Sequence, residues 1–169
     1  VYQKIFWASQ KLKILERLLT KKNYPLVIAI DGPAGSGKGT IAQKLSVKLN
    51  YHYLDSGAIY RVIAYAAKKE NIKSGSISSL INLVADSKIQ FKENHIWLND
   101  YEITDFIRTE IIGKLASKIA IHNELRASIL DYQRSFCKPP GLVAEGRDMT
   151  SVVFPNANLK IYLNASVDE

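Results

Sequence analysis

The segment from residue 25 to residue 50 constrains the fold of this chain more than any other. It reads PLVIAID, then GPAGSGKGT, then IAQKLSVKLN: a short apolar run, a loop of small residues, and a stretch with apolar residues at helical spacing. A buried strand that passes through a glycine-rich loop directly into a helix is typical of α/β proteins with a parallel sheet. The segment therefore predicts that architecture.

Strand and helix patterns alternate through the rest of the chain. Further buried strands are predicted at 51–54, 139–146 and 158–165, and helices at 56–71, 76–87, 105–121 and 123–137. The helix at 56–71 is expected to be capped by Ser56, and Ile41, Leu45 and Leu49 are expected on one face of the helix after the loop. Residues 88–103 alternate apolar and polar side chains across a polar turn at 93–94, which predicts a small β-hairpin. We expect one α/β domain over 26–169, with a parallel sheet, flanking helices and a hairpin insert.

The basic charge is concentrated at the start of the chain. Residues 1–26 hold six of the 23 Lys and Arg residues but one of the 16 acidic residues, so the formal net charge of +7 belongs mainly to this segment. Apolar residues at helical spacing predict a basic amphipathic leader over 1–25. Three interpretations stay open: a helix packed on the domain, an extension from a misplaced start site, or a membrane-surface or targeting helix.

Composition excludes several function classes. The nearly balanced charge after residue 26 argues against a dedicated nucleic-acid surface. The single cysteine, Cys137, cannot form an internal disulfide, and no Cys/His cluster has metal-ligand spacing. No apolar run is long enough to span a bilayer. These features predict a cytoplasmic protein.

The glycine-rich loop has the chemistry of a phosphate site. Gly32, Gly35 and Gly37 let the backbone curl so that its N–H groups converge on an anion, and the following helix adds the positive end of its dipole. Lys38 can reach the β- and γ-phosphates of a nucleotide, while a hydroxyl at the helix start can hold Mg²⁺. A tight structural turn is the weaker alternative. The predicted nucleotide-binding residues are Gly32, Pro33, Ala34, Gly35, Ser36, Gly37, Lys38, Gly39 and Thr40.

Gly39 departs from the usual loop motif. The sequence reads GKGT where that motif has Ser or Thr directly after the lysine, so the hydroxyl expected to contact Mg²⁺ moves to Thr40. This variant is similar to the loop of nucleoside monophosphate kinases. The loop alone does not establish that family.

A second set of motifs resembles the bacterial cytidylate (CMP) kinases. It consists of YLDSGAIYR (53–61), IRTEIIGKLASKIA (107–120), LR (125–126) and PGLVAEGRDMTSVVFPNANLKIYLNAS (140–166). The resemblance covers about 26–169, and these motifs are more specific than the loop. It implies a P-loop nucleoside monophosphate kinase-like sheet and transfer of a phosphoryl group from ATP, with Mg²⁺, to CMP or dCMP in pyrimidine nucleotide metabolism.

The resemblance also implies roles for individual residues. Lys38 and Arg147 would be catalytic, and the acceptor-binding region would lie within about 56–135. Ser56 and Arg61 would meet the CMP phosphate and ribose side, with Arg147 near the phosphates. The base would be recognised by Ser117, Arg126 and Asp148. These residue types suit the task, because arginine forks bind phosphates and Ser, Arg and Asp supply donors and acceptors for a pyrimidine edge.

Two departures from the family leave alternatives open. Thr150 and Ser151 stand where the family usually has Gly and then Thr, and the lid and final strand expected after 169 are not in this sequence, which would leave one sheet edge uncovered. The chain can be a cytidylate kinase, as a partial chain or completed by a separate polypeptide. It can also be a catalytically silent remnant that binds ATP or CMP. A third type, an adenylate, shikimate or gluconate kinase, is disfavoured by the DSGAIYR and GRD segments.

Overall fold

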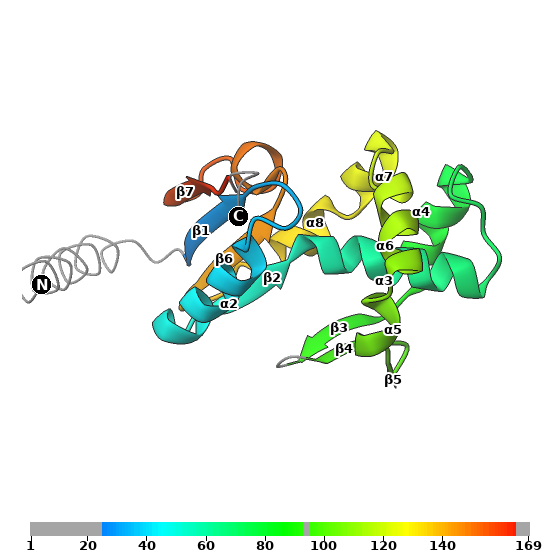
Figure 1. Ribbon diagram of the computed structural model, residues 1–169, viewed down its shortest axis with the longest axis horizontal. Coiled ribbons are helices and arrows are strands. Elements are labelled where there is room, and N and C mark those ends of the chain that lie inside the picture. Colours follow the sequence, from blue (N-terminus) through cyan, green and yellow to red (C-terminus); the bar gives the residue numbers. More distant parts are fainter. Residues whose placement is uncertain (1–24, 93–94, 165–169) are drawn as a thin grey trace, which may run out of the picture.

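The structure is a computed structural model that describes residues 25–92 and 95–164. The predicted leader helix, the hairpin turn at 93–94 and residues 165–169 lie outside this part. Within it, the chain is elongated, with a parallel sheet at one end and a group of helices at the other (Figure 1). None of the helices in 25–92 and 95–164 is long and apolar enough to cross a membrane.

Four parallel strands form the main sheet in the order β2-β6-β1-β7, which confirms the predicted fold class. Their bounds are β1 Leu26–Asp31, β2 His52–Asp55, β6 Gly141–Gly146 and β7 Leu159–Tyr162. The central strands are the most buried, as expected for strands covered on both faces, and every residue of β6 is buried. Within the described residues β7 pairs with β1 alone, and Tyr162 on it is 71% exposed. Within the described residues β7 is therefore an edge strand of this sheet.

Helix α2 (Lys38–Leu49) packs on one face of the sheet, over a small core of Ile30, Ala42 and Val143. The buried positions of α2 are Ala42 and Ser46, whereas Ile41, one of the three residues expected to share a face, is exposed. The small residues at 42 and 46 bring α2 close to the sheet. This proximity fixes where the loop before α2 lies.

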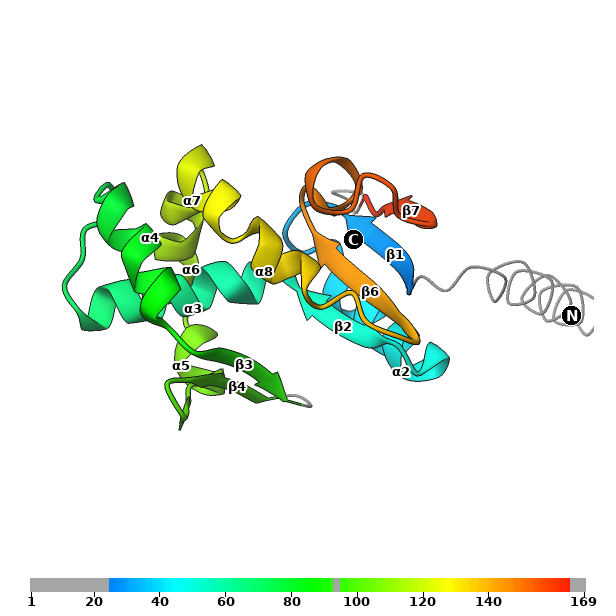
Figure 2. The same cartoon turned by 180° about the vertical axis from the view of Figure 1, so that it is seen from behind.

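The remaining helices form the other end of the molecule. Their bounds are α3 Ser56–Lys69, α4 Ile77–Asp86, α5 Thr104–Ile107, α6 Glu110–Ile119, α7 Asn123–Ser128 and α8 Leu130–Arg134. Helix α3 runs from the sheet into the helical group, and α8 returns from that group to the sheet (Figure 2). One large core joins both ends of the molecule, from Leu54 and Ala144 of the sheet to Leu80 of α4 and Ile119 of α6.

Several local predictions were wrong in detail. The two helices expected over 105–121 and 123–137 are four shorter ones, because Thr109 starts a new helix by accepting from the Ile112 N–H and Ile129 interrupts the second segment. Helix α3 is capped by Asp55, which accepts from the Ala58 N–H at 2.9 Å, and not by Ser56. The predicted hairpin, by contrast, is present: β3 Ile89–Lys92 pairs antiparallel with β4 His95–Leu98, and β5 Tyr101–Glu102 adds a third strand.

Candidate active site

The loop between β1 and α2 has the backbone of an anion cradle. Gly35 and Gly37 have φ angles of +80° and +76°, in the left-handed region that favours glycine. Gly37 caps α2 without a side-chain hydrogen bond, so the first N–H groups of the helix stay available to a ligand. The Ser36 hydroxyl is buried and has no hydrogen-bond partner among the described residues. An unpartnered buried hydroxyl beside free backbone donors fits a phosphate group.

Two other glycines in this segment are required by close packing. A Cβ on Gly32 would lie 2.3 Å from the Leu163 carbonyl oxygen, next to the end of β7. A Cβ on Gly39 would lie 3.0 Å from Oε1 of Glu145, whose carboxylate also accepts from the Tyr53 hydroxyl at 3.2 Å. The departure at position 39 thus has a physical reason: the side chain that the usual motif carries there would press on Glu145.

The Lys38 side chain folds back over the loop. Its Nζ donates to the Pro33 carbonyl oxygen at 3.1 Å and lies 3.8 Å from Oε2 of Glu145. Thr40 follows on the first turn of α2 and is exposed. Among residues 25–92 and 95–164 these are the contacts of the ammonium group, and it can exchange them for contacts with a bound phosphate.

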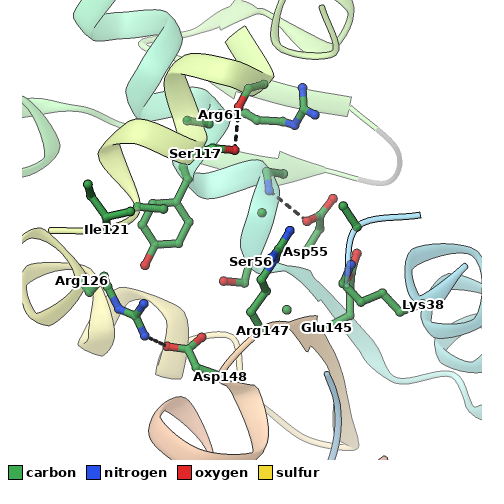
Figure 3. Close-up of a pocket in the computed structure, with 18 of the residues that line it drawn as sticks. Lys38, Asp55, Ser56, Arg61, Ser117, Ile121, Arg126, Glu145, Arg147 and Asp148 are labelled. Atoms are coloured by element: carbon green, nitrogen blue, oxygen red, sulfur yellow. Dashed lines mark hydrogen bonds and ion pairs between the residues drawn. The ribbon is translucent and has the colours of Figure 1, made fainter. Parts of the chain in front are cut away.

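A cleft of about 570 Å³ opens between this loop, the start of α3, the end of β6 and helix α6 (Figure 3). It brings together residues that are far apart in the sequence. The predicted site residues that line it are Ala34, Gly35, Lys38, Ser56, Arg61, Ser117, Arg126, Arg147 and Asp148. The other predicted loop residues are not part of its lining: Gly32, Pro33, Ser36, Gly37, Gly39 and Thr40.

Arg126 and Asp148 form an ion pair on one wall of the cleft, with Nη2 of the arginine 2.5 Å from Oδ2 of the aspartate. Burial raises the pKa of Asp148, and the neighbouring Arg126 guanidinium opposes that shift. Ser117 lies on α6, where its hydroxyl donates to the Gly113 carbonyl oxygen at 3.1 Å. Figure 3 shows Ser117 and the ion pair on the side of the cleft away from Lys38.

Two further arginines line the cleft, and each has guanidinium N–H groups that no described residue accepts from. Nη1 of Arg61 donates to the Ile107 carbonyl oxygen at 2.8 Å, and Gly113 leaves room for the guanidinium, because a Cβ there would lie 2.9 Å from Nη2. A guanidinium has five N–H donors, so this arginine can still bind an anion. Arg147 directly follows β6 and is exposed, and its guanidinium has no ion pair or hydrogen bond within residues 25–92 and 95–164.

Sequence reasoning missed two carboxylates between the loop and the arginines. Asp55 and Glu145 stand at the ends of β2 and β6, and both line the cleft. Burial, followed by the charge of Asp55, raises the pKa of Glu145 from 4.5 to about 7, while Lys38 opposes the shift. Burial raises the pKa of Asp55 as well. Their position at the carboxyl ends of parallel strands was the available signal, because sites in open α/β sheets form there.

Tyr60 and Asp31 were also missed. Tyr60 lines the cleft near the ion pair, and burial, with the charge of Asp148, raises its pKa to about 12. Asp31, at the end of β1, accepts from the Met149 and Thr150 N–H groups at 2.8 and 2.9 Å and from the Thr150 hydroxyl at 2.6 Å. These bonds hold a π-helical turn, η1 (Met149–Val153), directly after Asp148. The unusual Thr150 therefore contributes a bond to Asp31 that glycine cannot make.

The side chains around the loop can also be compared with the usual ligands of Mg²⁺. Within the described part of the chain no three His, Cys, Asp or Glu side chains form a group that could hold a metal ion. Mg²⁺ in phosphoryl-transfer sites is usually held by substrate phosphates and water with only one or two protein oxygens. Two hydroxyls of the loop, that of Thr40 and the unpartnered one of Ser36, are compatible with such a site.

Comparison with known proteins identifies the family of this chain. A family model described as cytidylate kinase matches residues 28–169. Similar curated proteins include the cytidylate kinases of Nitrosomonas europaea (48% identical over 151 residues, 89% of this chain and 67% of the relative) and Polynucleobacter asymbioticus (53% over 140 residues, 83% and 64%). The cytidylate kinase of Ralstonia nicotianae is 46% identical over 144 residues, 85% of this chain and 62% of the relative. The chain spans about two thirds of the length of these relatives, and it belongs to the cytidylate kinase family.

Proposed function

We propose that this chain contributes the donor loop and the acceptor pocket of an enzyme that transfers the γ-phosphoryl group of ATP to CMP or dCMP, giving ADP and CDP or dCDP. The observation that carries the proposal is the cleft itself. It joins a loop built to bind phosphate to an arginine–aspartate pair, with two more arginines between them. A kinase for a nucleoside monophosphate needs these three elements in one space.

On the donor side, the backbone of Gly32–Thr40 would bind the ATP phosphates. Lys38 would leave the Pro33 carbonyl oxygen and Glu145 to contact the β- and γ-phosphates. Thr40 would supply a protein oxygen for Mg²⁺, which when bound neutralises charge on the donor phosphates.

On the acceptor side, Arg61 and Arg147 would bind and orient the CMP phosphate, with Ser56 at the phosphate and ribose. Arg126 would donate to the O2/N3 side of cytosine. Asp148, paired with Arg126, would accept from the 4-amino group together with Ser117. A base with a different arrangement of donors and acceptors would leave these partly buried groups unpaired, which is costly.

We place this reaction in pyrimidine nucleotide metabolism, as the resemblance implies, and in the cytoplasm, as the composition indicates, with CMP or dCMP and ATP as the binding partners. Membership of the cytidylate kinase family argues against the adenylate, shikimate and gluconate kinase alternatives. A separate polypeptide that supplies the lid has no support in the comparisons. An activity assay distinguishes turnover by this chain alone from nucleotide binding without turnover.

The test is a coupled ADP-release assay of the purified chain with CMP, dCMP, UMP and AMP, run beside the Lys38→Ala variant. Turnover is expected with CMP and dCMP, and a much lower rate with AMP. If the chain binds CMP but its rate equals that of Lys38→Ala, the chain alone is a nucleotide-binding protein. Equal rates with CMP and AMP would contradict the assigned acceptor.

A further inference from the structure

A buried polar pair lies directly behind the acceptor side of the cleft. Gln133 on α8 donates from Nε2 to Oγ of Ser56, the first residue of α3, at 2.9 Å. The two side chains are 2% and 3% exposed, and the residues are 77 positions apart in the sequence. A buried hydrogen bond between two neutral side chains specifies their relative orientation, since either group left unpaired would cost free energy.

The bond determines what the Ser56 hydroxyl can do. A serine hydroxyl has one proton to donate and two lone pairs. Gln133 occupies one lone pair, and among the described residues nothing accepts the proton. Ser56 lines the cleft, and Figure 3 places its hydroxyl between Arg147 and the Arg126–Asp148 pair. The proton is thus available to an acceptor atom of a ligand in the cleft.

The residues before and after Gln133 anchor helix α8 to its surroundings. The preceding residue, Tyr132, donates from its hydroxyl to the Ile89 carbonyl oxygen of β3 at 3.1 Å. The following residue, Arg134, donates to the Val153 and Val152 carbonyl oxygens of η1 at 2.9 and 3.1 Å. Three consecutive residues of a short helix therefore contact the small sheet, Ser56 and η1. This anchoring fixes the Gln133 amide before any ligand binds, as a preorganised site requires.

We infer that Gln133 is a positioning residue for acceptor binding, which holds the Ser56 hydroxyl as a hydrogen-bond donor to a phosphate oxygen of the nucleoside monophosphate. The inference rests on the proposed function. Gln133 does not touch the substrate and acts only through Ser56. Without its N–H the hydroxyl can rotate, so part of the binding free energy is lost in ordering it again.

A double-mutant cycle tests this inference. Gln133→Met, which keeps the length of the side chain and removes the donor, is measured in the wild-type chain and in Ser56→Ala by calorimetric titration with CMP, and separately with ATP. Loss of one hydrogen bond to a charged oxygen weakens CMP binding roughly tenfold. In the Ser56→Ala background the same change is expected to alter CMP affinity by less than about twofold, because the interaction partner is gone. ATP affinity should stay unchanged in all variants.

Gln90→Met is the matched control, since Gln90 lies on β3, outside the lining of the cleft. Gln133→Glu is a second variant for the case in which Gln133→Met unfolds. Its introduced carboxylate, once ionised, accepts only and turns the hydroxyl proton away from the ligand. The loss of CMP affinity should then grow as pH rises through the pKa of that carboxyl group. In the Ser56→Ala background the same carboxylate still repels the CMP phosphate, so the role of Gln133 predicts a smaller pH dependence there than with Ser56 present, and an equal pH dependence in both backgrounds contradicts it.

The two proposals fail in different ways. Equal losses from Gln133→Met in the wild-type and Ser56→Ala backgrounds, or equal losses for CMP and ATP, overturn the role of Gln133. A wild-type chain that binds AMP or UMP better than CMP overturns the assigned acceptor, and the cycle is then read with the preferred monophosphate. A wild-type chain that binds none of the three overturns both.

Discussion

The donor loop and the acceptor wall of the cleft are built in different ways. The loop is made of consecutive residues, Gly32–Thr40, and its shape comes from the backbone at Gly35 and Gly37. The acceptor wall is made of side chains from α3, α6, α7 and the end of β6, joined by the Arg126–Asp148 ion pair. A site made of backbone tolerates few changes of residue type, whereas a site made of side chains can be altered for one ligand at a time. Changes on the two sides should therefore separate turnover from acceptor affinity.

Lys38→Ala should separate turnover from CMP affinity more than any other change. Removing the one lysine of the loop is expected to lower turnover roughly 10³-fold, because the charge developing on the transferred group loses a preorganised cation. CMP affinity should stay within about twofold, since Lys38 lies away from the ion pair (Figure 3). The ADP-release assay and calorimetric titration with CMP measure the two quantities. A parallel fall in both would show that the two sides are not separable.

Arg126→Ala is the complementary change on the acceptor wall. It removes a proposed contact to the base and leaves the half-buried Asp148 without its cation, so CMP affinity should fall roughly 10- to 100-fold. ATP affinity should be unaffected. Lys114→Ala serves as the control, because Lys114 pairs with Glu110 on the exposed side of α6. Equal losses of CMP and ATP affinity would remove the base-recognition role of Arg126.

Gly39→Ser restores the usual loop motif and tests the packing of the loop against Glu145. Its Cβ would lie 3.0 Å from Oε1 of a carboxylate that also contacts Lys38 and Tyr53, so ATP affinity should fall roughly three- to tenfold. Gly75→Ser is the matched control, because a Cβ there has no neighbour within 4 Å. ATP titrations of both variants provide the measurement. An ATP affinity equal to that of the wild type would show that Glu145 moves freely and that residue 39 can be either amino acid.

Glu145 lies between the donor loop and the acceptor wall. Of these changes, Glu145→Gln should have the smallest effect, and the effect is on thermal stability. The pKa of Glu145 is raised to about 7, so between about pH 4.5 and 7 the folded chain holds a proton that the unfolded chain has lost. The free energy of unfolding therefore falls as pH rises through this range and the loss remains above it. Without nucleotide and Mg²⁺, the variant should be more stable than the wild type at pH 8, by roughly 2–4 °C in thermal midpoint, and the gap should shrink toward pH 5.

Thermal unfolding at the two pH values measures this difference. Glu110→Gln is the control, since Glu110 is exposed and its removal should give no comparable pH dependence. A gap between variant and wild type that is the same at pH 5 and pH 8 would contradict the buried, raised carboxyl group at position 145.

Most of the fold could be predicted from the sequence because its signals are local. The apolar runs at β1 and β6 and the glycines at 35 and 37 read directly as buried strands and a phosphate-type loop, and both appear in the structure. The helix boundaries around Thr109 and Ile129 and the capping of α3 by Asp55 were missed. Each depends on a single hydrogen bond or a change of chain direction that periodicity does not record.

The loop could be predicted from its own residues, because positive φ angles at glycine and a helix start are properties of neighbouring residues. The sequence also indicated the residues of the acceptor wall through their resemblance to a family. The contacts between distant residues required the folded chain: Arg126 meets Asp148 across 22 residues, Gln133 meets Ser56 across 77, and Tyr53 meets Glu145 across 92. The raised pKa of Glu145 and the reason for Gly39 follow from those contacts, because burial and close approach exist only after the strands and helices have packed.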